Sequence, residues 1–355
     1  MTRYLVLTSD AETLCGVEAF TRNLAEHLGR SAQMAPLSFD IPTFRQRLRD
    51  FDCIVFNFPI VAWKKRLLEP MLVAMLAKLR GKKVAVVLHE WTNLDWKRRL
   101  IIWPVVRVAD QLLFSAPEIE REWRDSAVSR GSKQQTAVIP IPPNVVPGNS
   151  DGTGEAGTAI CSLRKPGRII IGQFGSIYPK KNCAELLSIA RVLIDAGHDV
   201  GVAFVGSFIK GVDDVEQDFY REVEARGLDG RVVVTGYLAT DEEVFAACRE
   251  IDVFCYRFTE GLTARRGSVL AAALTGRAVV VNAPKVERAL AHHSLFTSLI
   301  ENGNVVLAPY NADPTAMAGA VKIATAKRPP QVEVEKEIGR LWHRIIETLD
   351  KVQQR

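Results

Sequence analysis

Short runs of β-branched and apolar residues alternate along the chain with segments whose apolar residues recur every three or four positions, and this alternation occurs twice. The short runs have the length of buried strands, and the segments between them have the period of amphipathic helices. Such alternation is typical of a parallel sheet covered by helices. The sequence therefore predicts an α/β protein built from two successive doubly wound units.

The predicted elements divide the chain into two domains and a tail. Residues 141–157 combine Pro, Gly, Asn and Ser without periodicity, which indicates a loop and a domain linker. We therefore predict domains at 1–157 and 158–330, followed at 331–355 by an amphipathic helix that packs back on the first domain. The expected strands are 4–8, 53–57, 84–88, 111–115, 137–139, 168–172, 201–205, 232–235, 253–256, 278–281 and 305–307. The expected helices are 17–28, 67–79, 184–196, 215–226, 241–250, 267–274, 314–327 and 332–352.

Composition excludes several other classes of protein. The chain has 355 residues, 47% hydrophobic and 25% charged, which excludes intrinsic disorder. Its longest apolar stretches, 67–79 and 100–114, contain charges and fall short of the roughly 18 uncharged residues of a membrane span. The start of the chain lacks the features of a signal peptide, and six scattered cysteines form no Cys-x-x-Cys pair. We expect a cytoplasmic protein with reduced thiols.

The basic residues concentrate in the first half of the chain. Residues 1–150 hold 21 Lys and Arg against 15 Asp and Glu, whereas the remaining residues hold 25 against 26. Within 62–107, eleven bases and three acids are mixed with Trp63, Trp91, Trp96 and Trp103. This mixture favours a peripheral contact with the inner membrane surface over a nucleic-acid footprint, although a solvated helix surface remains the alternative.

Several enzyme classes are excluded by missing motifs. No Gly-x-Gly-x-x-Gly follows a predicted strand, so a dinucleotide-dependent dehydrogenase is not expected. The sequence also lacks a Walker A motif, a Gly-x-Ser-x-Gly elbow, a His-Glu-x-x-His motif and a cluster of His and Cys. We expect neither a metal nor another cofactor. His292 and His293 are expected on a surface turn.

Two strand-to-helix turns carry residues suited to a phosphate-bearing ligand. Gly16 opens a helix after the first strand, where it either lets an anion approach the helix-end amides or simply punctuates a turn. In the second half, a strand ends near Gly175 and Ser176, and Lys180 and Lys181 then precede a helix. An ammonium group at that place either meets a diphosphate or is solvated.

A third turn concentrates charge between the strand at 253–256 and the next helix. It contains one carboxylate, the two adjacent guanidinium groups of Arg265 and Arg266, and a helix N-terminus within a single loop. The loop runs from the strand through Glu260, Gly261, Arg265 and Arg266 and enters the helix at Gly267 and Ser268.

In their order along the chain, these turns resemble those of the retaining GT-B glycosyltransferases that use nucleotide-sugar donors (glycosyl transferases group 1). The resemblance covers nearly the whole length. The similar segments are the donor-binding pattern at 253–281, the phosphate motif at 174–182, the Glu-Asn-Gly turn at 301–303 and, in the first half, 15–18, His89 and 139–144.

This resemblance implies a fold and an activity. The fold would be GT-B, with two Rossmann-like doubly wound domains facing a central cleft and a C-terminal helix returning to the first domain. The enzyme, of hexosyltransferase type, would transfer a sugar with retention from a nucleotide diphosphate sugar to a glycan or polyprenyl-linked acceptor, in polysaccharide or glycolipid biosynthesis. No metal would be required.

The resemblance also implies roles for individual residues. Glu260, His89 and Lys181 would be catalytic: Glu260 would contact the donor sugar, Lys181 the diphosphate, and His89 the sugar or the transition state. A satisfied structural histidine is the alternative for His89. The implied donor-binding set is Gly16, Gly175, Ser176, Lys180, Lys181, Gly236, Tyr237, Glu260, Gly261, Arg265, Arg266 and Ser268.

Two departures from the family pattern leave other functions open. Ser176 stands where the family has a phosphate-binding arginine, and Ser268 where it has a second carboxylate. Arg265 and Arg266 either compensate for the lost phosphate-binding charge or are surface residues. The alternatives are a non-catalytic nucleotide-sugar-binding or partner subunit on the same fold, and a nucleotide-sugar epimerase or hydrolase.

Overall fold

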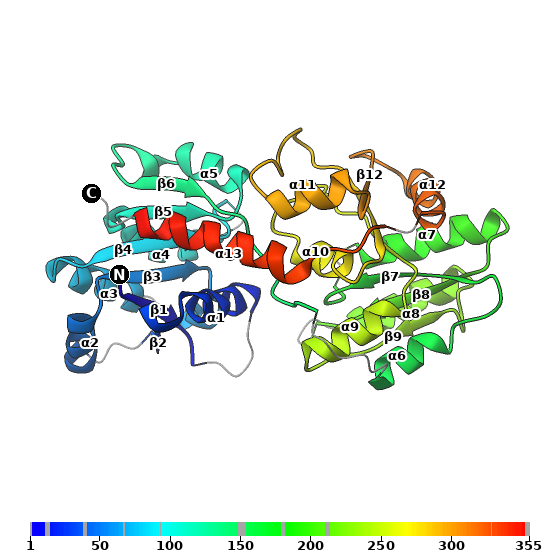
Figure 1. The fold of residues 1–355 in the computed structure, drawn as a ribbon, viewed down its shortest axis with the longest axis horizontal. Coiled ribbons are helices and arrows are strands. Elements are labelled where there is room, and N and C mark those ends of the chain that lie inside the picture. The colour runs from blue at the N-terminus through cyan, green and yellow to red at the C-terminus, as the bar shows by residue number, and fades with distance from the viewer. Residues whose placement is uncertain are drawn as a thin grey trace. The chain divides into compact units, whose positions relative to one another are not determined.

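The computed structural model describes residues 2–10, 15–37, 41–66, 68–92, 94–147, 154–178, 182–209, 214–327 and 329–351. Contacts divide the chain into two compact units. Unit 1 comprises Met1–Asn144 and Ile338–Arg355, and unit 2 comprises Val145–Glu337. Each unit contains one parallel six-stranded sheet with helices packed on it (Figure 1).

The sheet of unit 1 has the strand order β2-β1-β3-β4-β5-β6. Its strands are β1 (Tyr4–Thr8), β2 (Ala32–Pro36), β3 (Cys53–Phe58), β4 (Lys83–Leu88), β5 (Gln111–Phe114) and β6 (Gln135–Val138). Its helices are α1 (Gly16–Leu28), α2 (Ile41–Arg47), α3 (Glu69–Leu79), α4 (Trp96–Val108), α5 (Pro117–Arg124) and the C-terminal α13 (Val334–Asp350). The strand order reverses between β1 and β3, and ligands of such sheets bind at the carboxyl ends of the strands near such a reversal.

The sheet of unit 2 has the order β12-β11-β10-β7-β8-β9, with its reversal between β7 and β10. Its strands are β7 (Ile169–Phe174), β8 (Val200–Val205), β9 (Val232–Val234), β10 (Val253–Tyr256), β11 (Ala278–Asn282) and β12 (Val305–Ala308). Its helices are α6 (Gly154–Cys161), α7 (Cys183–Asp195), α8 (Val215–Ala225), α9 (Asp241–Arg249), α10 (Gly267–Ala273), α11 (Ser294–Glu301) and α12 (Pro314–Thr325). The two doubly wound units predicted from the sequence are confirmed.

Local signals in the sequence account for several helix starts. Thr240 and Glu243 form a reciprocal capping box at α9, in which each side chain accepts a hydrogen bond from the other residue's backbone N–H. Asp95 caps α4 by accepting from the N–H of Arg98, and Asp313 caps α12 in the same way. These caps satisfy backbone donors that the first helical turn leaves without partners.

The C-terminal helix packs on unit 1, as predicted. The buried ring of Trp342 stacks on Phe20 and on His27, with ring centroids 5.4 and 4.5 Å apart. At the far end of α13, the Tyr4 hydroxyl donates a 2.5 Å hydrogen bond to Asp350. Residues from the two ends of the chain therefore share one core.

The predicted linker is wrong at its end. Helix α6 begins at Gly154, inside the segment 141–157 that the sequence predicts to be a loop. Gly157 is buried against α9, where a Cβ would be in ordinary van der Waals contact, 3.6 Å, with the backbone oxygen of Ala246. Close packing against α9 thus outweighs the weak helix propensity of the glycines.

Five further elements differ from the prediction. The edge strand β2 and the helices α2, α4, α5 and α11 were not expected, and β2 lacks a hydrophobic pattern because most of its residues are not buried. His293 does not lie on a surface turn: it is fully buried and caps α11, with its ring accepting from the N–H of Phe296. The His293 side chain therefore has a structural role as the N-cap of α11 and is not exposed to solvent.

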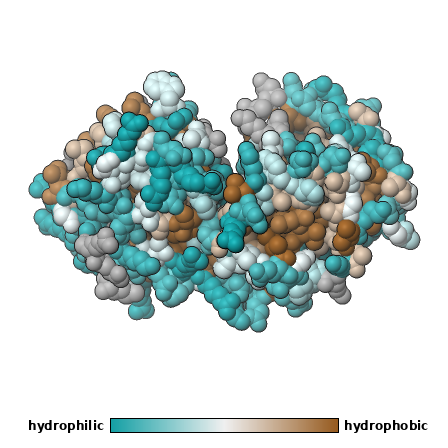
Figure 2. Space-filling model, turned by 90° about the horizontal axis from the view of Figure 1, so that it is seen from above, coloured by the Kyte–Doolittle hydropathy of each residue, from teal (hydrophilic) through white to brown (hydrophobic). Residues whose placement is uncertain are grey.

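The helices, the cysteines and the surface agree with the features expected from the composition. None of the described helices is long and apolar enough to cross a membrane. None of the six cysteines forms a disulfide. From above, the visible surface is mostly hydrophilic, with smaller hydrophobic areas among the hydrophilic ones (Figure 2).

Candidate functional site

The loops that follow β7 and β10 meet at the carboxyl edge of the unit 2 sheet. Asn182 precedes α7, and its side-chain amide donates a 2.9 Å hydrogen bond to the hydroxyl of Thr259 in the loop after β10. Asn182 has a positive φ of 53°, which asparagine tolerates better than most residues. The contact joins the two loops that flank the reversal of strand order.

A buried asparagine holds the loop after β10 in place. Asn282, at the end of β11, accepts a 2.9 Å hydrogen bond from the N–H of Phe258. Its amide donates to the carbonyl oxygens of Phe258 and Tyr310 at 2.8 and 2.9 Å. The sequence analysis missed this residue, and the signal available was a polar residue ending the otherwise apolar strand Ala-Val-Val-Val-Asn.

Gly261 makes the tight turn that follows Glu260. Its φ is 74°, and a Cβ there would lie 2.3 Å from the carbonyl oxygen of Ala283. Any side chain would therefore collide with backbone as well as strain the turn. The turn leaves the Glu260 side chain 53% exposed at the tip of the loop.

Two guanidinium groups follow this turn. The Arg266 guanidinium pairs with the Glu260 carboxylate at 2.6 Å and lies 4.1 Å from the centroid of the Phe258 ring. Burial lowers the pKa of Arg266, while the charge of Glu260 acts in the opposite direction. The Nε groups of Arg265 and Arg266 are buried without an acceptor among the described residues. These two donors therefore have no hydrogen-bond partner within the described part of the chain.

At the end of β7, the backbone at Gly175 lies close to the backbone at Gly206, which follows β8. A Cβ on Gly206, whose φ is 145°, would lie 2.5 Å from the carbonyl oxygen of Gly175. Ser176 follows Gly175 and is exposed. The absence of a side chain on Gly206 lets the turns after β7 and β8 approach one another.

Tyr256 ties the end of β7 to the start of α10. Its hydroxyl accepts a 2.9 Å hydrogen bond from the N–H of Phe174 and donates to the carbonyl oxygen of Ser268 at 3.3 Å. Burial raises the pKa of Tyr256 well above its ordinary value. The tyrosine therefore remains a neutral structural hydroxyl and places Ser268, the second residue of α10, beside the other loops.

The structure thus brings together one group of predicted residues and places the others elsewhere. The loops around the reversal in unit 2 contain Gly175, Ser176, Glu260, Gly261, Arg265, Arg266 and Ser268. Gly236 and the exposed Tyr237 follow the edge strand β9, where the Thr235 hydroxyl accepts a 3.0 Å hydrogen bond from the N–H of Gly206. Lys180 and Lys181 lie outside the described residues.

Gly16 and His89 belong to unit 1, at the carboxyl edge of its sheet. Gly16 is the first residue of α1, and its carbonyl oxygen accepts a 3.0 Å hydrogen bond from the side chain of Asn144. His89 follows β4 and is buried, with its ring edge-to-face against Phe20 at 5.1 Å. The packing of His89 against an aromatic ring agrees with a structural histidine.

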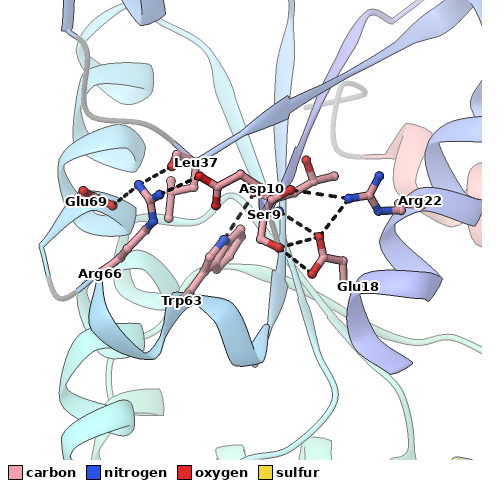
Figure 3. Close-up of polar contacts among 9 residues, drawn as sticks. Ser9, Asp10, Glu18, Arg22, Leu37, Trp63, Arg66 and Glu69 are labelled. Atoms are coloured by element: carbon pink, nitrogen blue, oxygen red, sulfur yellow. Dashed lines mark hydrogen bonds and ion pairs between the residues drawn. The ribbon is translucent and has the colours of Figure 1, made fainter. Parts of the chain in front are cut away.

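The same edge of unit 1 holds a buried carboxylate that the sequence analysis did not single out (Figure 3). Glu18, only 1% exposed, accepts hydrogen bonds from the N–H and hydroxyl of Ser9 at 3.1 and 2.6 Å. Arg22 lies 3.3 Å away on the next turn of α1. Because these donors satisfy the carboxylate, Glu18 fixes the start of the loop between β1 and α1.

Beside this carboxylate, Arg66 joins three separate segments (Figure 3). Its guanidinium donates to the carbonyl oxygen of Leu37 at 2.7 Å and pairs with Glu69 at 3.0 Å and Asp10 at 3.3 Å. Trp63, which is buried, donates its indole N–H to the carbonyl oxygen of Thr8 at 3.3 Å. Trp63 therefore belongs to the architecture of the sheet edge and not to an exposed basic surface.

Within the described residues, no three His, Cys, Asp or Glu side chains come together in a way that could hold a metal ion. The loop after β10 contains the carboxylate of Glu260 and the guanidinium groups of Arg257, Arg265 and Arg266, and Arg257 already pairs with Glu185 at 3.2 Å. The chemistry they can perform is the recognition of hydroxyl groups and of anions.

No protein-family model matches the sequence, and no curated protein matches it. Solved structures do match it over its full length. HepE from Anabaena, solved in complex with UDP and glucose, has 14% identity and a TM-score of 0.59, with 99% of this chain and 100% of that chain covered. A sucrose-phosphate synthase from Thermosynechococcus elongatus has 14% identity and a TM-score of 0.59, covering 98% and 95%.

A glycosyltransferase from Rickettsia africae has 10% identity and a TM-score of 0.65, covering 100% of this chain and 99% of that one. At such low identity the likeness concerns the fold alone. With two Rossmann-like units of six parallel strands and a C-terminal helix that packs on the first unit, the chain has the GT-B fold.

Proposed function

We propose that this protein is a glycosyltransferase that transfers a hexosyl group from a nucleotide diphosphate sugar to a glycan or lipid-linked acceptor, with retention of configuration. The observation that carries the proposal is the loop after β10. In that loop, an exposed carboxylate and two guanidinium groups with unsatisfied donors lie beside the reversal of strand order. Solved structures of the same fold include HepE with UDP-glucose and a sucrose-phosphate synthase, which supports a nucleotide-sugar donor.

The proposed donor site lies in unit 2. Glu260 would accept hydrogen bonds from the hydroxyl groups of the donor sugar, because its carboxylate is exposed at the tip of the turn. Arg265, Arg266 and Lys181 would meet the diphosphate. The base and ribose of the donor nucleotide would lie toward Gly236 and Tyr237. Ser176 and Ser268 would each contribute one hydroxyl where the related family has a charged group.

The principal catalytic demand in such a transfer is the negative charge that develops on the leaving diphosphate. Guanidinium and ammonium groups fixed in advance stabilise that charge without reorganisation during the reaction. Arg266 already contacts Glu260 and the ring of Phe258. Its side chain would therefore lose little conformational entropy when the diphosphate binds. We therefore propose that transfer proceeds without a metal ion, and expect EDTA to leave the rate unchanged.

The pattern at 253–281 that resembles retaining enzymes supports retention. In a retaining transfer of this kind, the acceptor hydroxyl attacks from the face that the diphosphate leaves, so the new glycosidic bond keeps the anomeric configuration of the donor. Analysis of the first product by NMR tests this directly. A product of inverted configuration would contradict the proposal of retention but not that of transfer.

Calorimetric titration with UDP, GDP, ADP and their common sugar conjugates, without added metal, tests the donor site. We expect one nucleotide to bind with a Kd in the micromolar range, and Arg265→Ala and Lys181→Ala to weaken it by about tenfold each, as the loss of a charge-assisted hydrogen bond predicts. Lys322→Ala on α12, an exposed base outside these loops, is the matched control.

Absence of binding to every nucleotide would overturn the proposal and favour a partner subunit without a donor. Release of free sugar in the absence of an acceptor, or isomerisation of the nucleotide sugar, would instead indicate a hydrolase or an epimerase.

A further inference from the structure

The outward side of α3 carries an apolar stripe. Leu68, which precedes the helix, and Met75 and Leu79 within it are exposed, and the half-buried Leu72 lies between them. Their spacing of four, three and four residues places them along one side of a helix. The opposite side of α3 is also apolar, because Val73 packs into the core. The helix is therefore apolar toward both the sheet and the solvent.

The neighbouring α4 repeats this arrangement. Trp96, Leu100 and Trp103 are exposed by 69%, 58% and 45%, again at spacings of four and three, while Ile102 and Val105 are buried toward the sheet. The two helices pack against each other and, as successive crossovers in a parallel sheet, run in the same direction. The two stripes thus lie on adjacent helices, each on the side away from the sheet, and we call the surface that carries them the α3–α4 face.

The charge around the α3–α4 face is positive. Lys97 and Arg107 are exposed on α4, and Lys78 is exposed on α3. The acids of the two helix starts are already engaged, since Glu69 pairs with Arg66 at 3.0 Å and Asp95 with Arg98 at 3.3 Å. The face therefore presents exposed tryptophan and aliphatic side chains bordered by bases.

A basic cavity lies where the two helices end. It has a volume of about 430 Å³ and is lined by Lys78, Lys83, Arg107 and Lys133 together with Asp110. Asp110 pairs with Lys78 at 2.7 Å, whereas Arg107 and Lys133 have no carboxylate partner among the described residues. The cavity thus keeps an excess of positive charge at one end of the apolar stripes.

We propose that the α3–α4 face binds the surface of an anionic lipid bilayer, with Trp96, Leu100, Trp103 and the α3 stripe at the boundary between headgroups and acyl chains. Tryptophan favours that boundary because its ring is apolar and its N–H is polar. The surrounding bases, including the cavity at the helix ends, contact anionic headgroups. Trp63 and Trp91 take no part, because both are buried.

Charge decides between a bilayer and a second copy of this chain as the occupant. A twofold contact between two α3–α4 faces would bring the bases of one copy against those of the other, and like charges oppose such a contact. An anionic bilayer complements both the charge and the apolar stripes. This inference goes beyond the proposed transfer of sugar, and its test uses no nucleotide, so either proposal can fail alone.

Cosedimentation of the full chain with vesicles tests the proposal. We expect binding to phosphatidylcholine vesicles that contain about one-third phosphatidylglycerol, little binding to pure phosphatidylcholine, and a marked loss at high salt. One double variant, Lys97→Gln with Arg107→Gln, removes charge, and a second, Trp96→Ser with Leu100→Ser, removes apolar surface. Each is expected to weaken binding by at least about tenfold.

The matched control lies on α12 in unit 2, where Lys322 and Ile323 are an exposed base and an exposed apolar residue. The double variant Lys322→Gln with Ile323→Ser should bind vesicles as the wild type does, and circular dichroism checks that all variants are folded. Failure of the wild type to bind, or unchanged binding of both α4 variants, would overturn the proposal. So would a dimer in sedimentation equilibrium that the Trp96→Ser, Leu100→Ser variant abolishes, because the face would then be covered by a second copy.

Discussion

The carboxylate of Glu260 and the guanidinium of Arg266 are 2.6 Å apart across the turn that Gly261 makes possible. The ion pair links Glu260, which we propose binds the donor sugar, to Arg266, which we propose binds the diphosphate. Arg266 is also held against the Phe258 ring, so its position is fixed by two contacts within the same loop. A substitution at either end of this pair is informative for that reason.

We expect Glu260→Ala to reduce transfer by at least about a hundredfold, because a hydrogen-bonding group that positions the donor is removed. Its side chain is 53% exposed, so the free energy of unfolding should change little. Steady-state rates with the donor identified by calorimetry measure the effect. Glu224→Ala, an exposed glutamate on α8, is the control, and unchanged turnover of Glu260→Ala would remove Glu260 from the site.

Asn282→Ala should lower the free energy of unfolding by about 2 to 3 kcal/mol, because the buried N–H and carbonyl groups that Asn282 satisfies lose their partner. The same variant should weaken nucleotide binding, since the loop after β10 loses its anchor. Urea unfolding and calorimetry measure the two effects. Asn302→Ala, at an exposed position, should change the stability by less than about 0.5 kcal/mol. Equal stability of the two variants would argue against the anchor.

Trp342→Ala should destabilise unit 1 by about 3 to 5 kcal/mol, because a buried ring stacked on Phe20 and His27 leaves a cavity. Thermal unfolding followed by circular dichroism measures the loss. His343→Ala, on the exposed side of the same helix, is the matched control and should be nearly neutral. A Trp342→Ala protein as stable as its control would show that the C-terminal helix is dispensable for unit 1.

The stability of unit 2 should depend on pH through Asp199. Hydrogen bonds from Arg231 and Arg168 lower the pKa of Asp199 below its ordinary value of 3.8. A lowered pKa stabilises the folded state above the pKa of the unfolded chain, and this contribution is lost as the pH falls through the folded pKa.

Asp199→Asn should therefore cost about 1 kcal/mol at neutral pH, discounted because the carboxylate is partly exposed. Denaturant unfolding at several pH values should show the wild type and Asp199→Asn converging below pH 3.8. A difference in stability that stays constant with pH would contradict this assignment.

The sequence alone determined the two α/β units, most of their strands and the return of the C-terminal helix. Short apolar runs that alternate with helical segments indicate strands buried in a parallel sheet. The apolar side of α13 is stable only when it is packed against a hydrophobic core. Glu260, Gly261 and the two arginines could be found because a turn after a strand is local in sequence. Ser176 and Ser268 were singled out only by the resemblance to the glycosyltransferase family, where charged residues stand at these positions.

Only the tertiary structure showed that Asn282 and Tyr256 hold those loops, because each acts through partners far away in the sequence. It also separated the four tryptophans of the basic region. Trp63 and Trp91 are buried, while Trp96 and Trp103 are exposed, although all four lie within the same basic region, 62–107. Burial depends on which side of an element meets the sheet. In α3 and α4, which are apolar on both sides, the sequence pattern cannot specify that side, and packing against the strands decides it.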